Sequence, residues 1–133
     1  MIIGIGIDIC SIKRIKKALT KYGNRFKNRC FTKIEIMKCD NVKNKSACYA
    51  KRFAAKEAVS KALGTGIRKG VYWKNIEIVN KKSGQPFVNL YDGAEKTLGS
   101  LLHENMLPKI HITITDDNDL AQAYVVIDAI IKF

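Results

Sequence analysis

Isoleucine recurs at every second position near the start of the chain, at residues 3, 5, 7 and 9. This period of two predicts a β-strand over residues 2–9, and its isoleucine side has the character of a buried strand face. The other side of the strand carries Gly4, Gly6 and Asp8. Two glycines on one face allow a helix or a ligand backbone to approach closely, and Asp8 would point into that approach.

The next part of the chain has the periodicity of α-helices. Ser11 is a suitable N-cap for a basic helix over residues 12–21 that has one apolar stripe. A short helix is expected over residues 32–39. Ser46 then opens a long helix that ends near residue 63, where glycines follow.

Shorter elements are expected in the second half of the chain. Strands around residues 76–78 and 87–90 flank a turn at residues 82–85, and a helix is expected over residues 92–104. Apolar residues alternate along residues 110–131 on either side of the acidic turn 116–119, which predicts a β-hairpin. These elements predict a single α+β domain over residues 1–133 rather than a regular βαβ series.

Charge is distributed unevenly along the chain. The net charge of +12 lies in residues 1–61, which hold 16 Lys and Arg against four acids, while residues 62–133 hold eight of each. Residues 13–29 contain eight cations and no acid. Such a field attracts polyanions, but nucleic acid, acidic lipid and acidic protein all qualify, and a solvated basic face needs no partner.

Composition argues against several classes of protein. The chain begins with only seven apolar residues before Asp8 and has no basic flank ahead of them, which predicts a cytoplasmic protein without a signal peptide or membrane span. Four cysteines stand 20, 9 and 9 residues apart with no CxxC pair, far from both histidines. This spacing argues against zinc and predicts free, buried thiols.

The long helix places a carboxylate on its packed face. At 100° per residue, Glu57 lies beside a row of small side chains made by Ala50, Ala54 and Ala58. Lys61, one turn later, could pair with Glu57, although an exposed pair of this kind is worth only about 0.2–0.5 kcal/mol. The small side chains leave room for another element to pack closely above Glu57.

Asp8 and Glu57 would converge if the glycine face of the strand met the alanine face of the helix. Two bare carboxylates would repel each other, and Mg²⁺ resolves this because it binds one or two carboxylates together with water and substrate phosphates. Lys61 would then face a phosphate, which indicates phosphoryl-group chemistry. The alternative for Asp8 is a cap on the helix that follows the strand. A flexible cationic rim follows the long helix: Gly64, Thr65, Gly66 and Arg68.

Two motifs carry a family resemblance. GIGIDIC at residues 4–10 with Arg14, together with FAAKEAVSKALGTGI at residues 53–67, resembles the holo-acyl-carrier-protein synthases, the small bacterial type of 4'-phosphopantetheinyl transferase. GQP at residues 84–86 and the ITITDD hairpin also lie where this family has them. The resemblance implies a small, mainly antiparallel sheet packed against a long central helix.

The resemblance also implies an activity in fatty acid biosynthesis. Members transfer 4'-phosphopantetheine from coenzyme A to a serine of apo-acyl-carrier protein, depend on Mg²⁺ and release adenosine 3',5'-bisphosphate. Asp8 and Glu57 would be the metal ligands, and Glu57 and Lys61 the catalytic residues. Either Glu57, through a metal-bound water, or water alone could accept the serine proton. The phosphates of coenzyme A would contact Lys61, Gly64, Thr65 and Gly66.

Further expectations from the resemblance concern partners. The acidic carrier protein would dock on the basic helix, and coenzyme A would bind at the subunit interfaces of a homotrimer. The docking residues would be Lys13, Arg14, Lys17 and Lys21. Two departures from the family stand out: Ser11 replaces a frequent acid, and Thr115-Asp116 replaces a frequent Ser-His pair. No histidine role is therefore expected, and His111 is expected to face solvent or a neighbour.

The alternative function is a small basic nucleic-acid-binding protein, since concentrated positive charge gives salt-sensitive phosphate binding. Residues 13–29 contain only Tyr22 and Phe26 as aromatic residues and no recognised binding motif. Asp8 and Glu57 would also repel phosphates unless a metal lay between them. The sequence therefore favours a transferase without a nucleic-acid or membrane partner.

Overall fold

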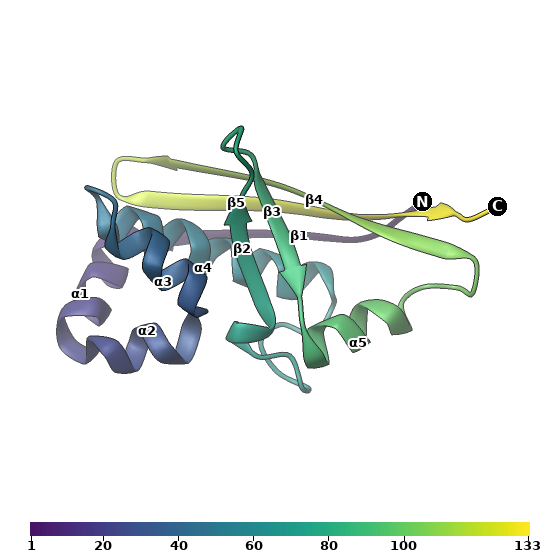
Figure 1. Ribbon diagram of the computed structural model, residues 1–133, viewed down its shortest axis with the longest axis horizontal. Coiled ribbons are helices and arrows are strands. Elements are labelled where there is room, and N and C mark those ends of the chain that lie inside the picture. The colour runs from purple at the N-terminus through teal and green to yellow at the C-terminus, as the bar shows by residue number, and fades with distance from the viewer.

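The computed structural model describes all 133 residues and has an α+β architecture, as predicted (Figure 1). One antiparallel sheet has the strand order β1-β5-β4, and a second is the hairpin β2-β3. In chain order, the elements are β1 (Ile2–Ser11), α1 (Ile12–Tyr22), α2 (Asn24–Cys30), α3 (Lys33–Asp40), α4 (Lys45–Ala62), a 3-10 turn η1 (Trp73–Asn75), β2 (Ile76–Asn80), β3 (Pro86–Leu90), α5 (Asp92–Ser100), β4 (Met106–Asp117) and β5 (Leu120–Ile131).

Helix α4 is the centre of the molecule. It packs against β1 and β5 of the larger sheet and also contacts α1, α3 and β2 (Figure 1). Ala54 and Ala58 are fully buried and belong to the same core as Val125 and Ile127 of β5. Small side chains on the helix let the sheet approach closely. None of the helices in the structure is long and apolar enough to cross a membrane.

The glycine face of β1 packs on α4, as the sequence predicts. A Cβ atom added at Gly4 would collide with the carbonyl oxygen of Ala62, and one added at Gly6 would collide with that of Ala58. Because both colliding atoms belong to the helix backbone, neither can move aside cheaply. Glycine at these two positions therefore sets the distance between strand and helix.

The isoleucine face of β1 is exposed, so the interpretation of that face as buried is wrong for this chain alone. Ile5 is 61% exposed, Ile9 is 57% exposed, and Tyr124 beside them on β5 is 49% exposed. Their strand register places all three on the side of the sheet away from α4. Because α4 takes the glycine face, Ile5, Ile7 and Ile9 point outward, where no other part of the chain covers them. Ile3 is half-buried and packs against the core.

The local signals around α1 are confirmed, with one addition. The Ser11 side chain accepts a hydrogen bond from the Arg14 backbone N–H and so caps the helix. Asp119, in the turn between β4 and β5, accepts hydrogen bonds from the Ser11 hydroxyl at 3.0 Å and the Lys13 backbone N–H at 2.9 Å. Asp8 plays no part in this cap, which removes the alternative role considered for it.

Three helices differ clearly from the prediction. Helix α2 was not predicted, and it follows α1 after a single residue, Gly23, whose φ is 52°. Asn44 rather than Ser46 caps α4, since its side chain accepts from the Ala47 N–H at 3.1 Å. Helix α5 ends at Ser100 instead of residue 104, because Gly99 and Ser100 are poor helix formers.

The prediction of four free thiols is wrong for two of them. Cys39 on α3 and Cys48 on α4 form a disulfide with a Cα–Cα distance of 5.4 Å, while Cys10 and Cys30 are free. The short connection over residues 41–44 brings the two helices side by side. Their cysteines then face each other, which the sequence spacing alone does not show.

A buried ion pair fixes α4 to the rest of the molecule. Lys56 and Glu35 are both fully buried, 2.7 Å apart, and Lys56 also donates to the carbonyl oxygens of Trp73 and Ile76. Burial lowers the pKa of Lys56, and Glu35 opposes that shift. Since Glu57 is the next residue on α4, these bonds also orient it.

Candidate active site

The first candidate site lies where the end of β1 passes α4. The Lys61 ammonium group donates to Asp8 Oδ1 at 3.0 Å and to the Ile7 carbonyl oxygen at 3.0 Å. Lys61 therefore pairs across to the strand and not with Glu57, one turn earlier on its own helix. We call Asp8, Glu57 and Lys61 the carboxylate site.

Glu57 has no ion pair or side-chain hydrogen bond, and it is half-buried. Burial raises the pKa of Glu57 above its ordinary value, the negative charge of Asp8 raises it further, and Lys61 lowers it. The charge of Asp8 thus acts on Glu57, 49 residues later in the sequence. That the two side chains converge on one metal ion stays a prediction.

The donor set of the carboxylate site is small. Nowhere does the chain bring together three or more His, Cys, Asp or Glu side chains that could hold a metal ion. Two carboxylates can nevertheless serve Mg²⁺, which keeps waters and takes substrate phosphates as its other ligands. A magnesium site of this kind is not a closed cage of protein ligands, because a phosphorylated substrate would have to supply some of the ligands.

The loop after α4 borders this site. It turns through Gly64 and Gly66, whose N–H groups donate at 3.0 Å to the carbonyl oxygens of Lys61 and Ser60. The Thr65 hydroxyl donates to the Gly66 carbonyl oxygen at 2.7 Å, and Arg68 Nε donates to the Thr65 carbonyl oxygen at 3.0 Å. Most polar groups of the loop are therefore occupied, and the N–H of Thr65 is free.

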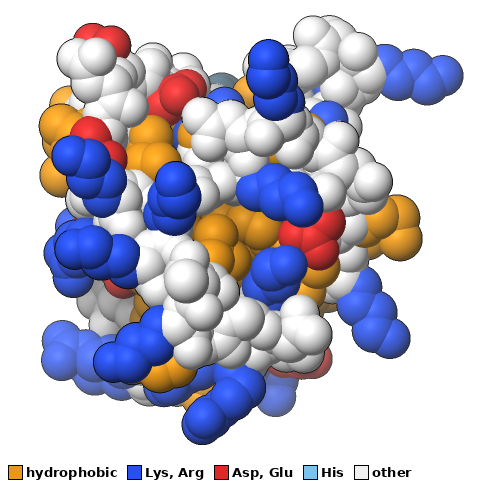
Figure 2. Space-filling view, turned by 90° about the vertical axis from the view of Figure 1, so that its left-hand side faces the viewer, with side chains coloured by type: hydrophobic (Ala, Val, Ile, Leu, Met, Phe, Trp, Pro, Cys, Tyr) orange, Lys and Arg blue, Asp and Glu red, His pale blue; other side chains and the backbone are white.

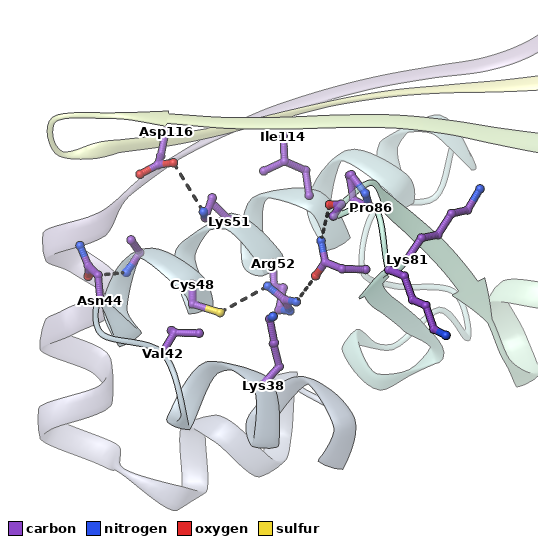
Figure 3. Close-up of a pocket in the computed structure, with 14 residues that line it drawn as sticks. Lys38, Val42, Asn44, Cys48, Lys51, Arg52, Lys81, Pro86, Ile114 and Asp116 are labelled. Carbon is purple, nitrogen blue, oxygen red and sulfur yellow. Dashed lines mark hydrogen bonds and ion pairs between the residues drawn. The ribbon is translucent and has the colours of Figure 1, made fainter.

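A second candidate site lies on another side of α4 (Figure 3). It is a groove of about 580 Å³ between α3, α4, the β2-β3 hairpin and the end of β4. We call it the basic groove, because five cations and a single acid, Asp116, line it. The cations are Lys38, Lys51, Arg52, Lys81 and Lys82.

Arg52 is the most constrained cation of the basic groove. It is only 6% exposed, and it donates to Asn80 Oδ1 at 2.8 Å and to the Cys48 sulfur at 3.3 Å. Its Nε–H is buried and has no hydrogen-bond partner. An unsatisfied buried donor is costly, but this atom is closed to solvent, so the positive charge that a ligand could reach comes mainly from the lysines of the groove.

Sequence reasoning missed the basic groove. Its lining residues come from residues 38–52, 80–86 and 114–116, which include parts of the GQP motif and of the ITITDD hairpin. Neither motif by itself indicates a groove, and the other signal is the excess of Lys and Arg in the first half of the chain. Folding gathers part of that excess around one groove.

The predicted docking residues lie on an exposed basic face. Lys13, Arg14, Lys17 and Lys21 of α1 are all exposed, and none of them forms an ion pair. Figure 2 shows Lys and Arg side chains spread over this end of the molecule, with apolar atoms exposed between them.

An apolar groove of about 510 Å³ adjoins the basic face. Phe53 and Trp73 stack in it with ring centroids 4.4 Å apart, and Arg25 and Arg29 also line it. The combination of exposed cations and an aromatic groove suits a partner that is acidic and carries apolar side chains.

Comparison with known proteins identifies the family to which the chain belongs. A sequence profile of the 4'-phosphopantetheinyl transferase superfamily matches residues 4–124, and the chain belongs to this superfamily. The holo-[acyl-carrier-protein] synthase of Rhizobium rhizogenes is 54% identical over 130 residues, which cover 98% of this chain and 97% of the relative. That of Brucella ovis is 52% identical over the same length, with the same shares of both chains covered.

Solved structures show the same fold. The crystal structure of holo-[acyl-carrier-protein] synthase from Neisseria meningitidis matches with a TM-score of 0.85 and 36% identity, covering 96% of this chain and 99% of that one. The Helicobacter pylori enzyme in complex with coenzyme A matches with a TM-score of 0.80 and 33% identity, covering 93% and 99%. The predicted α+β fold and the family resemblance are therefore confirmed.

Proposed function

We propose that this protein transfers 4'-phosphopantetheine from coenzyme A to a serine of apo-acyl-carrier protein in the cytoplasm and releases adenosine 3',5'-bisphosphate. The observation that carries the proposal is the carboxylate site, where two acids and a lysine from distant segments meet in a chain of this superfamily. The relatives' names and the coenzyme A complex of the Helicobacter pylori enzyme support the choice of substrates.

Asp8 and Glu57 would hold Mg²⁺ in this site. Their fit rests on the unpartnered Glu57 carboxylate, whose pKa is raised by burial and by Asp8, because a cation beside it would relieve both effects. When bound, Mg²⁺ offsets negative charge on the pyrophosphate of coenzyme A. The protein's own share is to keep both carboxylates in place, through the glycine contact of β1 and the buried Lys56–Glu35 pair.

Lys61 would contact the transferred phosphate. Two of its three N–H donors bind Asp8 and the Ile7 carbonyl oxygen, and the side chain is 49% exposed, so it can reach a substrate. The serine oxygen forms the new bond to phosphorus while the bond from phosphorus to the bisphosphate oxygen breaks. Lys61 would stabilise the charge that the leaving group acquires. Gly64, Thr65 and Gly66 would lie along the phosphates, with the Thr65 N–H as the donor available.

The serine proton needs an acceptor in this step. Glu57 acting through a metal-bound water is the acceptor we propose, since the glutamate side chain belongs to the carboxylate site and forms no hydrogen bond within the chain. Water alone is the alternative.

The basic groove would bind phosphate groups at the nucleotide end of coenzyme A. Coenzyme A carries a pyrophosphate and a separate 3'-phosphate, so one molecule needs cationic contacts in more than one place. Its five cations make this groove the cationic site best suited to a phosphate away from Lys61.

The acidic carrier protein would dock on the basic face. Lys13, Arg14, Lys17 and Lys21 have no acidic partner in the chain, and they are free to pair with a carboxylate-rich surface. The adjoining apolar groove would accept an apolar side chain of the same partner. Charge would then speed the encounter, and the groove would add affinity.

The exposed isoleucine face of β1 supports a homotrimer. Ile5, Ile7, Ile9 and Tyr124 form a continuous apolar surface on the larger sheet, and such surfaces mark interaction sites in soluble proteins. Pairing of this face with other subunits would cover it and place active sites at the interfaces. Analytical ultracentrifugation should show a trimer, and Ile7→Lys should shift it to monomer.

The direct test of the activity follows the released nucleotide. Chromatography should detect adenosine 3',5'-bisphosphate when protein, Mg²⁺ and coenzyme A are mixed with apo-acyl-carrier protein. Release should stop with a carrier whose acceptor serine is replaced by alanine. Release with that variant carrier would show hydrolysis of coenzyme A instead of transfer, and would contradict the proposal.

A further inference from the structure

Asp116 is the single acid of the basic groove. It lies on β4 opposite the fully buried Ala121 of β5, which places it on the face of the sheet that looks toward α4. Its Oδ1 atom is 3.6 Å from the Lys51 ammonium nitrogen, and the two side chains are 40% and 37% exposed (Figure 3). The distance makes this an ion pair and not a close hydrogen bond.

Such a pair is readily broken. Exposed ion pairs contribute little to stability, because water screens the charges and the side chains lose freedom when they pair. A phosphate that enters the groove offers Lys51 a more highly charged partner. Asp116 would then stand without its cation, beside an anion that repels it.

We propose that Asp116 limits the affinity of the basic groove for phosphorylated nucleotides and favours the release of the nucleotide product. It holds Lys51 when the groove is empty, opposes the bound phosphate, and recovers Lys51 as the nucleotide leaves. This inference rests on the proposed binding of phosphate groups in the basic groove.

The chain contains a matched control for this role. Asp117 is the next residue, carries the same charge and pairs with Leu120 at the end of the same hairpin. It does not line the groove, since alternate residues of a strand face opposite sides. Asp116→Asn and Asp117→Asn therefore change the net charge equally and differ only in position relative to the groove.

The experiment measures the dissociation constant of adenosine 3',5'-bisphosphate by titration calorimetry on the full-length protein with Mg²⁺. Asp116→Asn should tighten binding about three- to tenfold, as expected for removal of one repelling charge near the ligand in water-accessible surroundings. Asp117→Asn should change it less than twofold. Equal effects of the two variants, or no effect of Asp116→Asn, would overturn the proposal.

Two further variants separate this inference from the proposed use of the groove. Lys51→Gln and Lys81→Gln should each weaken binding of the bisphosphate. If both bind it as the wild type does, the groove is not the phosphate site, and the inference falls with that assignment. If both weaken it while Asp116→Asn has no effect, the inference alone is wrong.

The double variant Lys51→Gln/Asp116→Asn tests the link between the two side chains. If Asp116 acts partly by holding Lys51, the gain from Asp116→Asn should be clearly smaller in the Lys51→Gln background. An equally large gain in both backgrounds would contradict competition for Lys51.

Discussion

The carboxylate site and the basic groove use the same helix with opposite distributions of charge. The carboxylate site has two acids and one lysine, while the basic groove has five cations and one acid. Glu57 follows Arg52 by five residues, which corresponds to a rotation of about 140° around α4. One helix thus presents a site that suits a metal cation on one side and a site that suits anions on another.

The two sites also differ in how they are held. The backbone of β1 lies against the backbone of α4 at Gly4 and Gly6, so the carboxylate site has a rigid base. The cations of the basic groove are four lysines, three of them exposed, and the buried Arg52, which is the most constrained of the five. We infer that the first site demands accurate geometry and the second supplies mainly charge. Substitutions should therefore affect the carboxylate site more severely than the groove.

The largest effect is expected from removing a carboxylate. Asp8→Ala or Glu57→Ala should lower the transfer rate by at least about 100-fold, since even residues that only support metal ligands cost 10- to 100-fold. The melting temperature should stay within a few degrees of the wild type. Asp117→Ala, a surface acid outside both sites, is the control, and full activity of either site variant would refute the proposed metal ligands.

The rigid base of the carboxylate site predicts a large effect on stability. Gly6→Ala forces a Cβ against the Ala58 carbonyl oxygen and should cost about 1–3 kcal/mol of unfolding free energy, as overpacking does. Gly99→Ala on α5 meets no atom within 4 Å and should instead stabilise the helix slightly. Denaturant unfolding measures both, and a Gly6→Ala protein as stable as the wild type would contradict the close packing.

Substitutions on the basic face and in the basic groove should change the KM values of different substrates. Charge reversal at Arg14 and Lys17 should raise KM for the carrier protein about tenfold and leave KM for coenzyme A nearly unchanged, since both side chains lie on the basic face. Lys81→Gln in the basic groove should do the reverse. Steady-state kinetics with each substrate varied gives both constants, and Lys96→Glu on α5 is the control for net charge. Equal changes in both KM values would remove the distinction between the two surfaces.

The smallest effect concerns the pH dependence of stability. Because the folded protein raises the pKa of Glu57, it binds this proton more tightly than the unfolded chain, and ionisation of Glu57 opposes folding at neutral pH. Glu57→Gln should raise the melting temperature slightly at pH 7 without metal. The gain should vanish below the ordinary glutamate pKa of about 4.3, where both states are protonated. A gain that is independent of pH would show another cause.

The sequence predicted the carboxylate site because both of its faces are local patterns. A period of two placed Gly4, Gly6 and Asp8 together, and a period of 3.6 placed Glu57 beside small side chains. Both the glycine face of the strand and the alanine face of the helix consist of small residues, which indicates that these two elements pack together. The structure confirms that contact at atomic detail, down to the two helix carbonyl groups above the glycines.

What the sequence did not predict depends on contacts between distant segments. The basic groove, the Lys56–Glu35 pair and the Cys39–Cys48 disulfide each join residues whose spacing carries no periodic signal. The isoleucine pattern predicts a buried face, but a pattern shows only that a face is apolar and not what covers it. If the chain is a trimer, neighbouring subunits would cover this face.

Intact-protein mass spectrometry of the carrier protein tests the transfer of 4'-phosphopantetheine most directly. Apo-acyl-carrier protein incubated with this protein, coenzyme A and Mg²⁺ should gain the mass of one 4'-phosphopantetheine group. It should gain none when Asp8→Ala replaces the wild type. No gain with the wild-type protein, while a competent control enzyme converts the same carrier, would contradict the account.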